Sequence, residues 1–269
     1  MDHNFLIEKA KKMRRDIVQI VSSTKSSHIG SMFSIVDILI YLFYEKIEFT
    51  KENCMQTNRD KFILSKGHAS LALYSILYDK DIITKDDLYS YCKDGSCLIG
   101  HLDHKVKGVD VSTGSLGHGL SISAGMALAN KMNNNDHRVY CLLGDGECNE
   151  GSVWEALIFV SNNKLKNLVI ILDANKLQGF DYCEKILPES KLIDLLESMG
   201  LNFYEVNGHN FEEMKLLFNK IKDHDNDNAT IIFAHTIKGK GVSFMENKLE
   251  WHYKSPNEVE LKQALMELQ

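Results

Sequence analysis

Apolar residues near the N-terminus recur every three or four positions; they are Leu6, Ala10, Met13, Ile17 and Ile20. Because this spacing puts the apolar side chains on one face, the pattern predicts an amphipathic helix. The segment Ser34–Lys46 is apolar nearly all round and predicts a buried helix. Thr84, followed by Lys-Asp-Asp, is typical of a helix N-cap with acidic residues in the first turn. Helices are therefore expected in the first third of the chain.

Short apolar runs alternate with helical stretches in the second half of the chain. The apolar runs are Val139–Leu143, Leu168–Leu172, Phe203–Val206 and Thr230–Ala234. Helical stretches are expected near Ser121–Lys131, Val153–Asn163, Lys191–Met199, Phe211–Lys222 and Glu258–Gln269. The polar run Asp223–Asn228 is expected to be a loop. Apolar strands that alternate with helices predict an α/β fold with a mostly parallel sheet flanked by helices.

Composition limits the classes of function. The chain has 269 residues, enough for a sizeable core, and its net charge of −6 argues against non-specific nucleic-acid binding. No stretch approaches the roughly 18 consecutive apolar residues of a membrane span, and the N-terminus lacks the apolar core of a signal peptide. Six cysteines show no CxxC pair and no metal-ligand spacing, so free thiols in a reducing compartment are expected. We therefore expect a cytoplasmic protein without nucleic-acid or membrane partners.

Polar side chains follow two strands of the predicted sheet. The sequence GDG at 144–146 follows the Val139–Leu143 run, and Asn175 follows the Leu168–Leu172 run. Ligands of parallel sheets bind at the carboxyl ends of the strands, so Asp145 and Asn175 are expected close together. Carboxylate, amide and carbonyl oxygens suit Mg²⁺, which completes its shell with water and ligand phosphates. The glycines permit a tight turn into a helix start, where backbone N–H groups bind phosphate.

The pairing of GDG with an Asn about thirty positions later resembles the thiamine-diphosphate motif. The longer string GDGECNEGSVWEA…LKNLVIILDANKLQ is similar to transketolases in particular. Five further segments agree with that family and follow its order: SSHIGS at 26–31, LSKGHAS at 64–70, IGH at 99–101, STGSLGHGLSISAGMALA at 112–129 and HTIKGKG…EWH at 235–252. The resemblance covers nearly the whole chain and implies the thiamine-diphosphate-binding fold.

The resemblance implies a role for each residue that matches a family motif. The implied metal ligands are Asp145 and Asn175 through their side chains and Leu177 through its carbonyl. The implied contacts to thiamine diphosphate are Ser31, Lys66, His68, Gly114, Ser115, Leu116, Asp145, Gly146, Glu150, Asn175 and Lys238. The implied catalytic residues are His28, His68, His101, Glu150 and His252. Histidines suit proton transfer to and from sugar oxygens near neutral pH, and Glu150 is expected at an interface between cofactor-binding halves.

The implied reaction moves a two-carbon ketol unit from a ketose phosphate to an aldose phosphate, with thiamine diphosphate as the electron sink. The metal is expected to be Mg²⁺, which Ca²⁺ or Mn²⁺ could replace. A complete transketolase is more than twice as long, so residues 1–269 are expected to form a single thiamine-diphosphate-binding domain without the pyrimidine-binding and C-terminal domains. A C-terminal partner subunit would supply these, in a heterotetramer of two plus two chains. The chain begins with Met and ends without an obvious cut inside an element, which favours a natural subunit over a truncated form.

Two positions depart from the family pattern. His118 stands where family members usually carry Gln and adds a possible charge near the diphosphate. Tyr253 stands where Gly is common and is expected to narrow the entrance to the site. His101 and His104 form an HxxH pair, but the flanking glycine favours a loop over a zinc site.

This pattern bears on three alternative functions, and it disfavours two of them. A related thiamine-dependent ketol or acyl transferase of a specialised sugar pathway is the first, because the groups that bind the sugar phosphate lie mostly in the missing half. A non-catalytic transketolase-like subunit is disfavoured, since the implied site residues are intact. A dinucleotide-binding domain is disfavoured because no GxGxxG follows an early strand.

Overall fold

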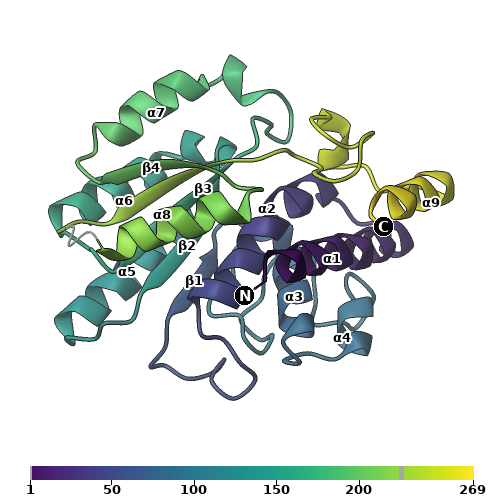
Figure 1. Cartoon of the computed structure of the whole chain (residues 1–269), viewed down its shortest axis with the longest axis horizontal. Helices are drawn as coiled ribbons and strands as arrows, with labels where there is room; N and C mark the ends of the chain where they lie inside the picture. The colour runs from purple at the N-terminus through teal and green to yellow at the C-terminus, as the bar shows by residue number, and fades with distance from the viewer. Residues whose placement is uncertain (1, 224–226) are drawn as a thin grey trace.

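The computed structural model describes residues 2–223 and 227–269, in which a five-stranded parallel sheet lies between layers of helices (Figure 1). The strands are β1 (Lys61–Leu64), β2 (Val139–Gly144), β3 (Leu168–Ala174), β4 (Asn202–Asn207) and β5 (Thr230–His235). Their order across the sheet is β1-β2-β3-β5-β4, and all neighbours run parallel. The predicted α/β fold with a mostly parallel sheet is confirmed.

The predicted helices are present, with small shifts at their ends. The helices are α1 (His3–Thr24), α2 (Ile29–Tyr41), α3 (Ser70–Asp79), α4 (Lys85–Tyr89), α5 (His118–Met132), α6 (Gly151–Asn162), α7 (Glu189–Glu197), α8 (Phe211–Asp223) and α9 (Glu258–Glu267). The buried helix begins earlier than predicted, at Ile29, and ends in a π-helical turn over Leu42–Lys46. Thr84 caps α4 in a capping box with Asp87. The loop expected at Asp223–Asn228 contains residues 224–226, which lie outside the described residues.

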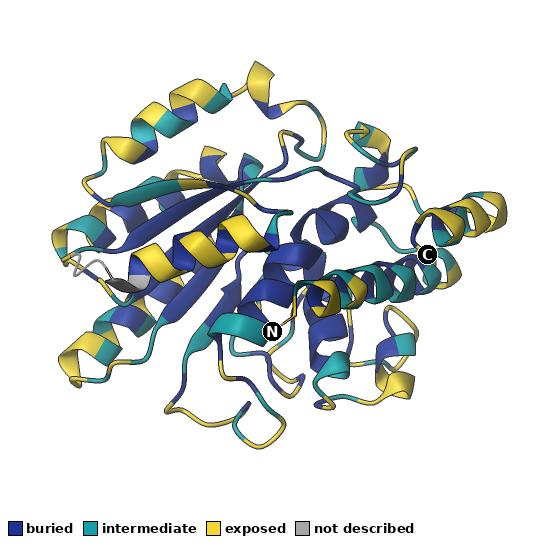
Figure 2. Cartoon of the chain, in the orientation of Figure 1, coloured by how far each residue is buried: buried dark blue, intermediate teal, exposed yellow. Residues whose placement is uncertain are grey.

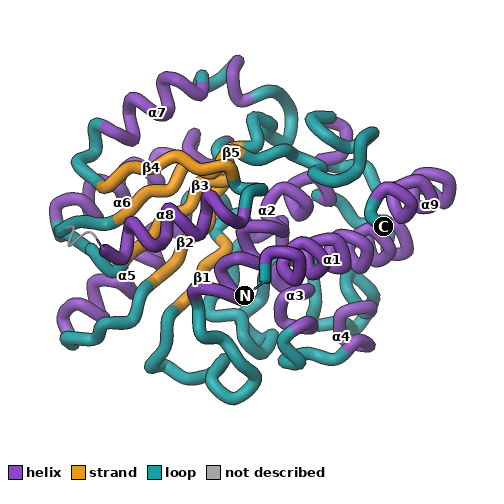
Figure 3. The backbone as a smooth tube through the Cα atoms, viewed as in Figure 1, coloured by secondary structure: helices purple, strands orange, loops and turns teal. Residues whose placement is uncertain are grey.

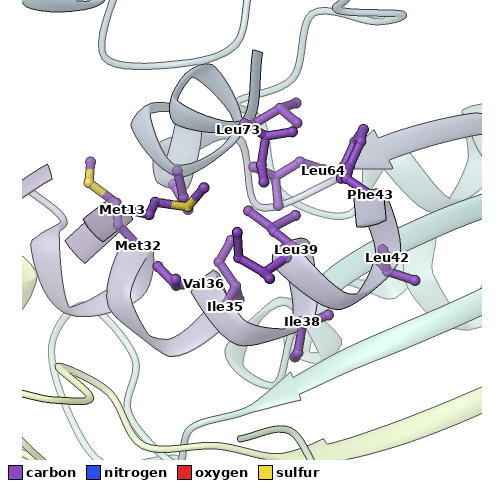
Figure 4. Packing of buried hydrophobic residues seen from close by; sticks show 14 of the residues in the cluster. Met13, Met32, Ile35, Val36, Ile38, Leu39, Leu42, Phe43, Leu64 and Leu73 are labelled. Carbon is purple, nitrogen blue, oxygen red and sulfur yellow. The ribbon is translucent and has the colours of Figure 1, made fainter. Parts of the chain in front are cut away.

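Two apolar cores lie on opposite faces of the sheet, because side chains alternate along each strand. In β2, Tyr140 and Leu142 pack with α1, α2, α3 and α8, whereas Cys141 and Leu143 pack with α5, α6 and α7. Figure 2 shows β2, β3, β5 and α2 as the most continuously buried elements, whereas the edge strand β4 is largely half-buried or exposed. Side chains of α2, among them Leu39, meet those of α1, α3 and β1 in the first core (Figure 4). Each such fully buried side chain contributes roughly 1.5–3 kcal/mol to stability.

The sheet topology decides where a ligand can bind. Because the five strands are parallel, the loops that follow them leave the same edge of the sheet (Figure 3). The sequence pattern did not predict β1, whose four residues are too few to show a periodicity. This short strand pairs with β2 at the margin of the sheet and positions the loop that begins at Ser65. None of the described helices is both long and apolar enough to cross a membrane.

Candidate active site

Four histidines with an implied catalytic role come together from four separate segments of the chain. The ring centroid of His28 lies 5.0 Å from that of His68, 5.0 Å from that of His252 and 6.1 Å from that of His101. Burial, followed by neighbouring positive charges, lowers the pKa of His28 to about 4 and that of His252 to about 3. Burial also lowers the pKa of His68 well below its ordinary value. His28, His68 and His252 are therefore neutral imidazoles near pH 7, each able to donate one hydrogen bond and accept another.

The backbone at the start of α2 fixes two of these histidines relative to each other. His28 has φ +75°, a left-handed conformation that residues other than glycine seldom adopt. Its N–H donates to the carbonyl of His252 at 2.7 Å, and its own carbonyl accepts from the N–H groups of Ser31 and Met32. This conformation costs of order 1–3 kcal/mol, which the surrounding contacts must offset.

Two buried lysines lie beside the histidines. Lys66 donates to Asp173 Oδ2 at 2.5 Å and to the carbonyl of Ser31 at 3.2 Å. Lys238 donates to the carbonyl of Leu177 at 2.9 Å, and its Nζ lies 2.9 Å from His252 Nδ1. Burial and then the charge of Lys66 lower the pKa of Lys238 to about 8. Lys66 is paired with Asp173, so Lys238, which contacts a carbonyl and an imidazole, is the buried cation that suits the site to an anionic ligand.

Asp173, which the sequence reasoning did not single out, is the carboxylate that pairs with Lys66. It is fully buried and accepts hydrogen bonds from Lys66, from Ser34 Oγ at 2.8 Å, from Asn175 Nδ2 at 2.7 Å and from Thr236 Oγ1. Burial opposes ionisation, but the charge of Lys66 and these bonds hold the pKa of Asp173 below its usual value. A carboxylate at the end of an otherwise apolar strand was the available signal.

The implied metal ligands lie in neighbouring loops after β2 and β3, as the sheet order requires. Asp145 accepts from the N–H of Gly146 at 2.8 Å and from that of Lys176 at 2.5 Å. Asn175 turns its NH₂ toward Asp173, which leaves its amide oxygen as the acceptor. Burial, followed by repulsion from Asp173, raises the pKa of Asp145 to about 6. A divalent cation would favour the ionised carboxylate, and carboxylate and amide oxygens are of the kind that bind Mg²⁺.

A second buried carboxylate, Glu147, joins three loops of the site and was also missed by sequence reasoning. Its Oε1 accepts from Ser65 Oγ at 2.5 Å and from the N–H of Gly117 at 2.8 Å. Its Oε2 accepts from the N–H of Gly144 at 3.2 Å. Glu147 thereby holds the glycine-rich loop before α5 against the loops that follow β1 and β2. Glutamate inside GECN has no feature that distinguishes it from a turn residue, because its partners lie far away in the sequence.

The glycine-rich loop at 114–119 is tightly packed. A Cβ at Gly119 would lie 2.4 Å from Ser65 Oγ, and one at Gly114 would lie 3.1 Å from His101 Cδ2. Gly117 has φ +83°, and a Cβ there would lie 2.3 Å from Ser152 Oγ. The loop therefore brings its backbone close to the other site segments, and the closest approaches, at Gly117 and Gly119, leave no room for a side chain.

The remaining sequence-predicted residues differ in their exposure. Ser115 and Glu150 are exposed, and Leu116 is half-buried. The loop predicted around the HxxH pair is confirmed, and His104 Nδ1 lies 2.8 Å from Ser112 Oγ. His118 is exposed at the first position of α5. Tyr253 is 63% exposed, and its ring centroid lies 4.6 Å from that of His252.

Comparisons with known proteins agree with this geometry. Residues 7–268 match the family described as transketolase, thiamine diphosphate binding domain. The chain is 37% identical to one of the subunits of the apulose-4-phosphate transketolase of Phocaeicola vulgatus, over 96% of this chain and 92% of that protein. It is 33% identical to the 6-deoxy-6-sulfo-D-fructose transketolase subunit of a Clostridium species, over 98% of this chain and 96% of that protein.

The chain is also similar to a solved transketolase in three-dimensional structure. The solved transketolase of Campylobacter jejuni superimposes with a TM-score of 0.92 at 29% sequence identity. The superposition covers 100% of this chain but only 43% of that transketolase. The chain therefore spans less than half of the solved enzyme, while it matches the subunit-sized relatives along almost their whole length.

Proposed function

Because the chain belongs to the transketolase family, through that family's thiamine diphosphate binding domain, we propose that it is the N-terminal subunit of a two-part transketolase. With a C-terminal partner subunit, it transfers a two-carbon ketol unit from a ketose phosphate to an aldose phosphate. The observation that carries this proposal is the convergence of four histidines and two buried lysines in one cluster.

The negative charge of the diphosphate of thiamine diphosphate complements the positive charge of the lysines in this cluster. Lys66, Lys238 and His68 are the residues that we assign to it. Backbone groups of Gly114, Ser115, Leu116 and Gly146, together with Ser31 and Glu150, are the further cofactor contacts. An anion beside Lys238 would favour its charged form and raise its pKa back toward the ordinary value, offsetting the effects of burial and of the Lys66 charge.

Mg²⁺ is the metal that we assign to Asp145, Asn175 and the carbonyl of Leu177. Few protein oxygens are offered, which suits an ion that also takes water and diphosphate oxygens as ligands. Ca²⁺ and Mn²⁺ are expected to substitute for it.

Thiamine diphosphate, when bound, supplies the carbanion and electron-sink chemistry that no side chain of this protein offers. The imidazoles of His28, His101 and His252 bind the sugar oxygens and exchange protons with them. Their depressed pKa values keep His28 and His252 neutral at pH 7, so each ring can accept a hydrogen bond from a sugar hydroxyl. Each well-placed acid or base contributes about 10²–10⁴-fold in rate.

The proposed partner rests on those relatives of this chain that are named as transketolase subunits. We propose that residues 1–269 form one thiamine-diphosphate-binding domain, and that the partner chain carries the pyrimidine-binding and C-terminal domains. A cytoplasmic heterotetramer of two chains of each kind is the proposed assembly. Relatives that are named as transketolase subunits and have nearly the same length support the division into two chains. Glu150 is exposed and is the acid that we place at an interface between cofactor-binding halves.

A second candidate function is the same ketol-transfer reaction with a different sugar as substrate. The relatives are named for apulose-4-phosphate and for 6-deoxy-6-sulfo-D-fructose, neither of which is an ordinary pentose phosphate. The chain therefore also suits a transferase of a specialised sugar pathway. Assay of the reconstituted enzyme against a panel of ketose phosphates and sulfonated ketoses separates the two candidates.

Calorimetric titration of the chain with thiamine diphosphate, with and without Mg²⁺, tests the proposed cofactor site. Asp145→Ala is expected to abolish Mg²⁺-dependent binding, whereas Asp181→Ala, which removes a carboxylate paired with Lys185 in the loop after β3, is expected to leave binding unchanged. His28→Ala and His101→Ala are expected to keep cofactor binding and to lose turnover in the assembled enzyme. Unchanged binding by Asp145→Ala would remove the metal assignment, and full turnover in both histidine variants would remove them from the catalytic residues. Failure of the unmodified chain to bind would favour a non-catalytic transketolase-like subunit.

A further inference from the structure

A series of buried and partly buried hydrogen bonds connects the first two helices to the loop that carries Lys238. Arg14 of α1 donates to both carboxylate oxygens of Asp37 in α2, at 3.0 and 2.7 Å. Asp37 Oδ2 lies 2.6 Å from His209 Nδ1. On the other side of the same ring, the backbone N–H of Ile237 donates to His209 Nε2 at 2.9 Å. The sequence motifs imply no role for any of these four residues, although Ile237 lies within the HTIKGKG segment, and the proposed reaction uses none of them.

These contacts fix the tautomer of His209. Since Nε2 accepts from a backbone N–H, the ring proton must sit on Nδ1, where it points at Asp37. Asp37 stays ionised because, although burial opposes ionisation, the charge of Arg14 and the bond to His209 lower its pKa to about 2. The carboxylate thus holds the imidazole in the form that accepts from Ile237.

Each residue of the segment 236–239, which contains Ile237 and Lys238, is held by a hydrogen bond. The N–H of Thr236 donates to the carbonyl of Ala174, and the N–H of Gly239 donates to the carbonyl of Gly30. Between them, Ile237 is held by His209, and Lys238 extends its side chain to Leu177 and His252. His209 lies in the loop that follows β4, and β4 and β3 flank β5 on opposite sides. Its side chain therefore holds Ile237 from the β4 side, whereas Ala174 at the end of β3 holds Thr236 from the other side.

We propose that His209 is a positioning residue, which places Lys238 for the cofactor by accepting the backbone N–H of Ile237. This proposal rests on the proposed function, because Lys238 is assigned to the diphosphate there. Without the acceptor, the segment of the free chain can shift and let water satisfy the Ile237 N–H. Cofactor binding must then return the segment to its original position, which costs free energy. We therefore expect the cofactor to bind about tenfold more weakly.

Two conservative variants separate positioning from a merely structural role. The amide oxygen of Gln can reach the place of Nε2, so His209→Gln keeps an acceptor for Ile237. The amide of Asn reaches only the place of Nδ1, so His209→Asn keeps the bond to Asp37 and loses the one to Ile237. His209→Ala loses both. The matched control is His235→Gln, because the His235 ring pairs with Glu205 at 2.7 Å and holds none of these backbone groups.

The experiment measures the Kd of thiamine diphosphate with Mg²⁺ by calorimetry on the full chain, and hydrogen exchange of the Ile237 amide without ligand. We expect about tenfold weaker binding and faster exchange for His209→Ala and His209→Asn. His209→Gln and His235→Gln are expected to match the unmodified chain. Equal binding and equal exchange in all variants would overturn the proposal, and so would a His209→Gln variant as impaired as His209→Ala.

Nitrogen-15 NMR of the unmodified chain adds a readout that needs no variant. We expect a protonated Nδ1 and an unprotonated Nε2 for His209, and the opposite tautomer would overturn the proposal. If the unmodified chain binds no thiamine diphosphate, the proposed function fails, whereas the exchange and NMR measurements still decide whether His209 holds Ile237.

Discussion

Replacement of Glu147 by Gln tests how much the site depends on one buried carboxylate. The carboxylate accepts from Ser65 Oγ and from two backbone N–H groups, those of Gly117 and Gly144. A Gln side chain has nearly the same size but offers only one oxygen. Whichever way its amide turns, its NH₂ faces a backbone N–H, and one of the two is left without an acceptor.

The magnitude follows from these contacts. An unpaired buried donor costs about 1–3 kcal/mol, so we expect Glu147→Gln to lose about 2 kcal/mol of unfolding free energy. In a chain of this size that corresponds to a fall in Tm of about 4–8 °C. The same change frees the glycine-rich loop at 114–119, so thiamine diphosphate binding should weaken as well.

Urea unfolding, followed by fluorescence of Trp154 and Trp251, measures the loss of stability. Glu155→Gln, on the exposed face of α6, is the control and should remain within about 0.5 kcal/mol of the unmodified chain. A Glu147→Gln variant as stable as this control would refute the reasoning, because it would mean that the hydrogen bonds to Gly117 and Gly144 contribute nothing.

Three further predictions concern other parts of the site. Gly117→Ala places a Cβ 2.3 Å from Ser152 Oγ at φ +83°, so it should lower Tm by several degrees, as scanning calorimetry would show, and Gly125→Ala, in open space on α5, should not. The folded-state pKa of Asp37, about 2, lies below its ordinary value of 3.8, so its ionisation stabilises the protein above about pH 4. That stability should disappear as the pH falls toward 2, and acid unfolding of Asp37→Asn should lack this component. Tyr253→Gly should widen the entrance and raise kcat/KM for bulkier ketoses, and an unchanged substrate profile would show that Tyr253 lies outside the substrate path.

Much of the fold could be predicted from local patterns. The spacing of Leu6, Ala10 and Met13 predicts α1 because a helix buries one face, and all three are buried. The apolar runs at 139–143 and 168–172 predict β2 and β3 because strands of a parallel sheet are covered on both faces. The neighbouring positions of these strands then explain why Asp145 and Asn175 end in adjoining loops. The strand β1 was missed since four residues carry no readable period.

The site was only partly predictable, for a physical reason. The histidines were found through the family resemblance, since no spacing rule relates His28 to His101 or His252. Glu147 and His209 were missed because each acts on groups that are distant in sequence. Glu147 bonds Ser65, 82 positions away, and His209 bonds Asp37, 172 positions away. Such roles become visible only when the fold brings the partners together.

Native mass spectrometry of the protein purified from its own cells tests the central claim most directly. The account predicts a complex of two copies of this chain with two copies of a second chain, carrying thiamine diphosphate and Mg²⁺. Dissociation of that complex should weaken cofactor binding without abolishing it, since the partner is proposed to supply the pyrimidine-binding part of the site. A homo-oligomer without a second chain and without thiamine diphosphate would contradict the account.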